Sequence, residues 1–176
     1  MLYIVSLLCV ICGVALDQYT KYLATTHLQD KSIPIIEGVF QLYLLPGGNT
    51  GGAWGILGGH LWLLILVSLV ATLAIIIVYM RLPRETKYMP LRICLVSITI
   101  GAIGNLIDRI LYGSVIDFLY FELINFPVFN VADIFASVAT CVLIVLLLFY
   151  YKEQDFDTIY NTLKWKARKK QESRDE

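Results

Sequence analysis

The sequence predicts an all-α integral membrane protein with four transmembrane helices, a small extracytoplasmic β-like cradle and an aromatic loop. Hydrophobic residues make up 58% of the 176 positions and charged residues only 16%, whereas soluble domains carry about 25% charged residues. The mean hydropathy is +0.71. The apolar residues also gather into four long stretches. The formal net charge is zero, so there is no electrostatic reason to expect nucleic acid as a partner.

The four apolar stretches are each close to the roughly 20 residues that a membrane-spanning helix needs. They run from Met1 to Leu23, from Leu61 to Met80, from Ile93 to Tyr112 and from Ile134 to Tyr151. The first stretch has an alternative interpretation as a cleavable signal peptide. It lacks a basic n-region and no A-x-A-like cleavage site follows it, so we expect a retained helix.

The basic residues predict the orientation in the membrane, because Lys and Arg concentrate in cytoplasmic segments. Eleven of the 14 fall between the second and third stretches or after the fourth: Arg81, Arg84, Lys87, Arg92, Lys152, Lys164, Lys166, Arg168, Lys169, Lys170 and Arg174. We therefore expect both termini to be cytoplasmic and the loops at about 24–60 and 113–130 to face outward.

The chain divides into a membrane domain at 1–151 and a basic cytoplasmic tail at 152–176. The tail is expected to contact anionic membrane lipid. A docking site for another protein is the alternative.

The two outward loops have different compositions. Ile33 to Leu45 is rich in β-branched and aromatic residues and ends at Pro46-Gly47-Gly48, which predicts a short hairpin or small sheet lying on the membrane. The second loop holds five aromatic residues, which favour the headgroup level. They are Phe118, Tyr120, Phe121, Phe126 and Phe129.

The cysteines and histidines indicate no metal or cofactor site. All four cysteines fall inside the apolar stretches, where they are expected to pack as small apolar residues. His27 and His60 are isolated in the sequence, so no zinc-ligand spacing is present.

Polar residues inside the spans are costly, and they are functional candidates for that reason. They occur at three places: Asp17 and Lys21, then Asn105, Asp108 and Arg109, then Asn130 and Asp133. A helix rises about 1.5 Å per residue, so Asp108 lies ~24 Å beyond Arg92. The predicted topology therefore places all three groups near the outer boundary of the membrane.

Each group also has a purely structural interpretation. Asp17 and Lys21 are four residues apart and can form a simple ion pair on one helix face. Arg109 can extend to the interface at a helix end, and Asn130 can be an N-cap with Asp133 at the third helical position. The glycines of the third span, Gly101 and Gly104, can serve only close helix packing. The functional interpretation depends on the convergence of the groups.

Among these polar residues, the carboxylates are the groups that could catalyse a reaction. Two facing aspartates cannot easily both ionise, so the pair shares a proton, and one can activate water while the other donates a proton. The candidates are Asp17, Asp108, Asp117 and Asp133, and position along the helices does not decide between Asp108 and Asp117. The dipole at the start of the fourth helix favours the ionised form of Asp133.

Five motifs resemble the bacterial lipoprotein signal peptidases, also called signal peptidase II, in the order of that family. They are Asp17-Gln18-x-x-Lys21, Asn49-Thr50-Gly51-Gly52-Ala53-Trp54-Gly55, Gly101-x-x-Gly104-Asn105-x-x-Asp108-Arg109, Val115-Ile116-Asp117-Phe118 and Phe129-Asn130-x-x-Asp133. The resemblance covers about residues 15 to 140. Gly52 stands where the family usually has Ala, and Gly48 stands where the family often has a basic residue, so a headgroup or substrate contact by a charge at that position is in doubt.

The resemblance implies a non-metal aspartyl endopeptidase with Asp117 and Asp133 as the catalytic pair. The matching positions that bind substrate or brace the site are Asp17, Lys21, Asn49, Gly51, Asn105, Asp108, Arg109 and Asn130. The implied substrate is a prolipoprotein that carries diacylglycerol on its lipobox cysteine, and the cut falls just before that cysteine. The resemblance also implies inhibition by globomycin-type peptides and a place in the bacterial cytoplasmic membrane, and we expect a monomer.

Two other functions remain as alternatives. A small proton-coupled transporter also uses membrane carboxylates, but it usually places them near the midplane and often has internal repeats. A membrane scaffold subunit would use the same ion pairs for packing. A presenilin-type protease would need a Gly-x-Gly-Asp motif, which this sequence lacks.

Overall fold

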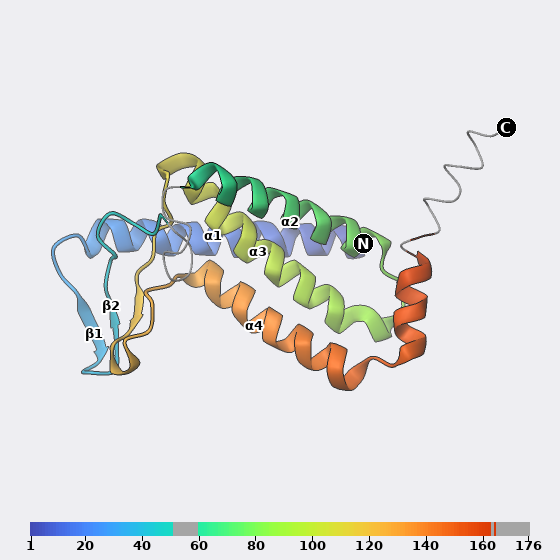
Figure 1. Cartoon of the computed structure of the whole chain (residues 1–176). Coiled ribbons are helices and arrows are strands. Elements are labelled where there is room, and N and C mark those ends of the chain that lie inside the picture. The colour runs from blue at the N-terminus through green and yellow to red at the C-terminus, as the bar shows by residue number, and fades with distance from the viewer. Residues whose placement is uncertain (51–59, 163, 165–176) are drawn as a thin grey trace.

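The structure is a computed structural model and describes residues 1–50, 60–162 and 164. Four long helices lie side by side in it, as Figure 1 shows: α1 (Leu2–His27), α2 (Leu61–Arg81), α3 (Met89–Tyr112) and α4 (Val131–Val145). The last turn of α4 continues as a π-helix, η4 (Leu146–Tyr150). All four are long and apolar enough to cross a membrane, judged by length and composition. The predicted fold class, with its four spans, is confirmed.

A small antiparallel sheet sits at one end of the helices. Its strands are β1 (Ile33–Ile36), β2 (Phe40–Leu42) and β3 (Leu119–Phe121), in the order β1-β2-β3. The first two form the hairpin that the sequence predicts. The third comes from the loop between α3 and α4 and was not expected, because a three-residue strand is too short to show alternation. A 3-10 turn, η3 (Glu122–Ile124), follows β3.

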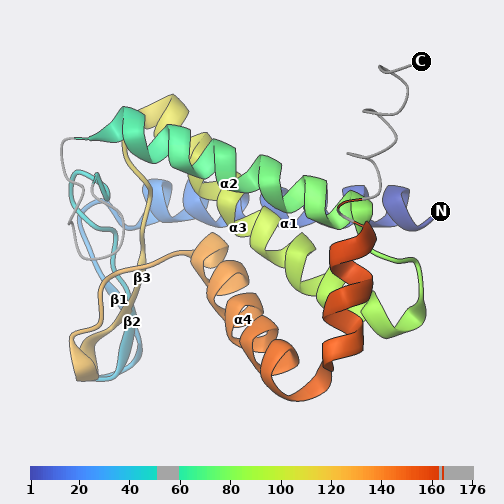
Figure 2. The ribbon, with the colours of Figure 1, turned by 45° about the vertical axis from the view of Figure 1, so that its right-hand side comes forward.

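The sheet packs on the last turns of α1. Ala24 and Leu28 form a buried cluster with Phe118 and Leu119, so the loop after α3 is fixed against the first helix. Figures 1 and 2 show the sheet at one end of the helices, and the start of α1 and the last described helix at the other. We call these the sheet end and the terminal end.

Two glycines in α3 shape the sheet end. A Cβ at Gly104 would lie 2.6 Å from a carboxylate oxygen of Asp17 and 3.0 Å from Cβ of Ala132, so the absence of a side chain lets α1 and α4 approach α3. Gly113 ends α3 with φ of 75°, a left-handed conformation that glycine adopts without strain. The chain turns there toward the sheet.

The terminal end is closed by aromatic and basic side chains. The buried guanidinium of Arg92 donates to the backbone oxygens of Tyr79, at 3.1 Å, and Leu82, at 2.7 Å. Its carbon lies 4.9 Å from the ring centroid of Tyr79. These carbonyls are the unpaired acceptors at the end of α2, so Arg92 caps that helix.

Residues 153–162 form a further helix that crosses the terminal end, as Figure 2 shows. Its buried Asp155 accepts hydrogen bonds from the hydroxyl of Tyr88, at 3.2 Å, and from the N–H of Lys152, at 2.9 Å. Asp155 also forms an ion pair with Lys87 at 2.5 Å. Tyr88 ends the 3-10 turn η2 (Thr86–Tyr88) and stacks on Tyr151. These contacts fix the start of the last helix.

Candidate active site

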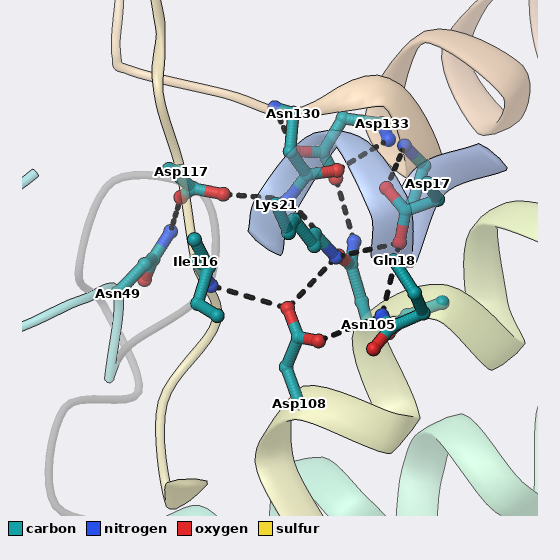
Figure 3. A network of polar contacts seen from close by, with 12 residues as sticks. Asp17, Gln18, Lys21, Asn49, Asn105, Asp108, Ile116, Asp117, Asn130 and Asp133 are labelled. Atoms are coloured by element: carbon teal, nitrogen blue, oxygen red, sulfur yellow. Dashed lines mark hydrogen bonds and ion pairs between the residues drawn. The ribbon is translucent and has the colours of Figure 1, made fainter. Parts of the chain in front are cut away.

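Polar side chains from α1, α3, α4 and the loop after α3 converge at the sheet end, as Figure 3 shows. The centre of the network is Lys21 of α1, which is 1% exposed. Its ammonium nitrogen lies 2.8 Å from Asp17 and 2.7 Å from Asp108, and donates to Oδ1 of Asn105 at 3.1 Å. Every donor of the ammonium is thus used. Lys21 is part of the framework of the site and has no donor left for a substrate.

The two aspartates bonded to Lys21 also hold backbone N–H groups. Oδ1 of Asp17 accepts the N–H of Ala132 at 2.8 Å, and Oδ2 of Asp108 accepts the N–H of Ile116 at 3.1 Å. Both carboxylates are fully buried. A buried carboxylate must be paired and hydrogen-bonded to be tolerated, and these two are. We refer to Asp17 and Asp108 as the bracing aspartates.

Asp117 stands on the loop before β3, and two amides hold it. The Nδ2 of Asn49 donates to Oδ2 at 2.9 Å, and the Nδ2 of Asn130 donates to Oδ1 at 2.6 Å. Asn49 is itself fixed by paired backbone bonds to Val115, at 2.8 and 2.9 Å. The bridge between positions 49 and 115 therefore aligns the first loop with the segment that carries Asp117.

Asp133 stands in the first turn of α4. Its Oδ1 accepts from Nδ2 of Asn105 at 2.7 Å, and its Oδ2 accepts the backbone N–H of Asn130 at 3.1 Å. The Asn130 side chain in turn accepts the N–H of Asp133 at 3.0 Å, so the two residues form a capping box. Asn130 thus contacts both aspartates: its Nδ2 donates to Asp117, and both its backbone N–H and its Oδ1 bond Asp133. The two residues that cap the start of α4 are therefore also residues of the candidate active site.

Neither Asp117 nor Asp133 forms an ion pair with a lysine or arginine among the described residues. The pKa of Asp117 is raised to about 6, chiefly by burial and also by the nearby charge of Asp133, and the hydrogen bonds from Asn49 and Asn130 offset part of this rise. A carboxyl of this kind holds a proton near neutral pH more readily than an ordinary aspartate does.

The two carboxylates line a cavity of about 380 Å³. Its walls are otherwise mostly apolar side chains, with four further polar residues: Asn49, Asn105, Arg109 and Ser137. The buried Nε of Arg109 has no hydrogen-bond partner in the described part of the chain. Apolar walls with a few convergent polar groups are typical of a site for an organic ligand.

The structure brings together most of the residues that the sequence singles out. The predicted ion pair of Asp17 with Lys21 and the predicted N-cap at Asn130 are both present, and both are also parts of the network. Gly51 and Gly52 lie outside the described residues. The sequence analysis gives no role to Gln18, whose amide bonds both bracing aspartates, at 3.2 and 2.8 Å. The signal that could have indicated a role for Gln18 is its position in the Asp17-Gln18-x-x-Lys21 motif.

The fold and the site define a multi-span membrane protein in which two carboxylates, one buried and one partly buried, line a mostly apolar cavity. The sequence profile of the family described as "Signal peptidase (SPase) II" matches residues 9–149. The chain belongs to this family of bacterial membrane-bound aspartic peptidases. The resemblance seen in the motifs is confirmed.

Known relatives match over most of their length. The lipoprotein signal peptidase of Brevibacillus brevis is 40% identical over 133 residues, which are 75% of this chain and 87% of that protein. That of Clostridioides difficile is 39% identical over 151 residues, 85% of this chain and 97% of that protein. A bacterial membrane enzyme solved by the in meso method at 2.3 Å resolution superposes with a TM-score of 0.73 and 29% identity, covering 85% of this chain and 92% of that chain.

Proposed function

We propose that the protein cleaves the signal peptide from diacylglyceryl-modified prolipoproteins, just before the lipobox cysteine, with Asp117 and Asp133 as its catalytic residues. The observation that carries this proposal is the contrast in partners. The bracing aspartates are bound to Lys21, whereas Asp117 and Asp133 are held by amides and backbone and line the cavity. Only the second pair is free to exchange protons with a substrate.

The two carboxyls have different roles in the reaction. Asp133 is the ionised partner, because it lies at the positive end of the α4 dipole. Its carboxylate takes a proton from water as the water oxygen attacks the scissile carbonyl carbon. Asp117, whose pKa is raised to about 6, gives its proton to the carbonyl oxygen. The resulting diol collapses as Asp133 gives its proton to the amide nitrogen and the C–N bond breaks. One diol hydroxyl returns its proton to Asp117 as the new carbonyl forms, which restores the starting state of the pair.

The place of the site fits this substrate. The diacylglyceryl chains hold the cysteine near the membrane surface, and a scissile bond beside it lies at the same depth. The cavity lies at the sheet end of the helices, since Asp117, Phe129 and Asp133 line it, and its apolar walls suit a peptide that emerges from the bilayer. Arg109, which lines the cavity, is available to a polar group of the substrate.

A cleavage assay with matched substrates tests the proposal. We expect the purified protein to cut a lipobox peptide with a diacylglyceryl cysteine and to leave the same peptide without lipid intact. Globomycin should abolish the cut. Equal cleavage of both peptides would refute the assigned substrate, and no cleavage of either would refute the proposed function.

We further propose that both termini lie in the cytoplasm and that the site faces outward. This is supported by the basic residues that follow α2 and α4, at the end opposite the sheet. An epitope tag placed after Glu176 should survive protease added to intact spheroplasts and disappear after permeabilisation. Loss of the tag in intact spheroplasts would reverse the orientation.

The segment 152–176 is proposed as a basic tail that contacts anionic lipid, attached to a monomeric peptidase at 1–151. Five basic residues and no acidic residue occur between positions 164 and 170, and such clusters bind anionic headgroups. Removal of residues 165–176 should weaken salt-sensitive binding to phosphatidylglycerol vesicles and leave cleavage unchanged. An unaltered salt dependence would exclude the tail as the lipid contact.

A further inference from the structure

The bracing aspartates act on the backbone directly beside the proposed catalytic pair. Asp17 accepts the N–H of Ala132, the residue before Asp133. Asp108 accepts the N–H of Ile116, the residue before Asp117. Each bracing carboxylate therefore fixes the chain one residue upstream of one catalytic carboxyl. A change in the distance between the bracing carboxylates would therefore move Asp117 and Asp133 relative to one another.

Two side chains of α1 link the bracing carboxylates to one another, as the dashed lines in Figure 3 show. Lys21 is one of them. The other is Gln18, whose Nε2 donates to Oδ2 of Asp17 at 3.2 Å and to Oδ1 of Asp108 at 2.8 Å. The same nitrogen lies 3.2 Å from the backbone oxygen of Gly104.

The position between the two bracing carboxylates suits a neutral hydrogen-bond donor with a fixed direction. All three neighbours of the Gln18 amide nitrogen are oxygens that only accept hydrogen bonds, so the amide must present its nitrogen there. Lys21 supplies charge on a flexible stem with rotatable donors. The planar amide of Gln18 takes Oδ1 of Asp108, which leaves Oδ2 for Lys21 and the N–H of Ile116. Gln18 thus sets the rotation of the Asp108 carboxylate.

We propose that Gln18 is a positioning residue of the peptidase reaction: it ties Asp17 to Asp108 and thereby fixes how Asp117 and Asp133 face one another. This inference rests on the proposed function. Gln18 touches neither catalytic carboxyl and acts only through the bracing aspartates. Because catalysis is sensitive to small displacements of reacting groups, its loss should slow the chemical step and leave substrate binding unchanged.

The test compares Gln18→Met with Thr20→Val. Met keeps the length of the side chain and removes the donor. Thr20 lies on the same helix and donates to the backbone oxygen of Asp17 at 2.8 Å, outside the carboxylate network. Its hydrogen bond is partly buried, as those of Gln18 are, so its variant controls for the loss of such a bond. With the lipidated peptide, Gln18→Met should lose about 10-fold in kcat with KM within about twofold. Thr20→Val should match the wild type in both. Gln18→Glu, which replaces the donor by an acceptor, should lose more kcat than Gln18→Met.

The outcomes separate this inference from the proposed function. If the wild type cleaves and Gln18→Met keeps its kcat, or loses no more than Thr20→Val, the positioning role is overturned. If the wild type itself cleaves nothing, the proposed function fails first. Should Gln18→Met not fold, Gln18→Asn decides. It keeps the amide but is one methylene too short to reach Asp108, so an undiminished kcat overturns the role and a selective kcat loss supports it.

Discussion

The sheet end and the terminal end both bury charged side chains, but they neutralise them differently. At the terminal end, Arg92 is bonded to the carbonyls that end α2, and Asp155 is paired with Lys87. At the sheet end, Asp117 and Asp133 have only amide and backbone donors in the described part of the chain. A buried charge without a counter-ion costs stability. The comparison teaches that the terminal end provides partners for its buried charges, whereas the sheet end leaves without a counter-ion, in the described part of the chain, the two carboxyls that we propose as catalytic.

The largest expected effect is at the two uncompensated carboxyls. Asp117→Asn and Asp133→Asn should each lower kcat by about 10³-fold or more, because the pair can no longer activate water and donate a proton. Both variants should fold, since an amide of the same shape carries no charge to bury. Cleavage of the lipidated peptide and thermal unfolding in detergent measure the two effects. Retained cleavage in either variant would remove that aspartate from the mechanism.

At the terminal end, a change to Arg92 should lower stability and leave activity unchanged. Arg92→Met should lower the free energy of unfolding by about 2–4 kcal/mol, because buried carbonyls at the end of α2 lose their donors. The kcat of the folded fraction should remain that of the wild type. Arg84→Met is the matched control, since Arg84 is exposed and its guanidinium lies over the ring of Tyr3. A fall in kcat without a fall in stability would contradict the division between the two ends.

The acidity of Asp117 gives a pH dependence with a defined sign. The proposed mechanism needs its proton, and its pKa is raised to about 6, by burial first of all. The value of kcat/KM should therefore fall about tenfold per pH unit above this pKa. Asn49 lowers the pKa by its hydrogen bond, so Asn49→Ala should move the fall to higher pH. A shift to lower pH would contradict the assignment of the proton to Asp117.

The smallest effect is expected at the last helix. Asp155→Asn removes the ion pair with Lys87 and should speed hydrogen exchange in residues 153–162 a few-fold. Cleavage should be unchanged. Asp157→Asn, an exposed position on the same helix, serves as the control. An equal change in both variants would show that the Asp155 contacts do not hold the helix.

The four spans could be predicted from hydropathy, because an uncharged stretch of the length of Leu61 to Met80 has few other interpretations. The motifs likewise pointed to the family. The role of Gln18 could not be predicted, since its partner Asp108 is 90 residues away and a polar residue beside an ion pair is unremarkable. Arg92 counted only as one more loop charge, because its acceptors are backbone atoms that a sequence does not distinguish. The choice between Asp108 and Asp117 needed the resemblance, and their partners now distinguish them.

The π-helical end of α4 has a consequence for how the chain tolerates changes in length. The N–H of Tyr151 bonds to the oxygen of Leu146 at 2.9 Å, five residues back, so this turn holds one residue more than an α-helical turn would. Deleting one residue from 147–149 would convert the turn to ordinary α-helix and keep the ring of Tyr151 on Tyr88. The wide turn therefore holds one residue more than the helix needs, and the chain can lose that residue without rotating the ring of Tyr151 away from Tyr88.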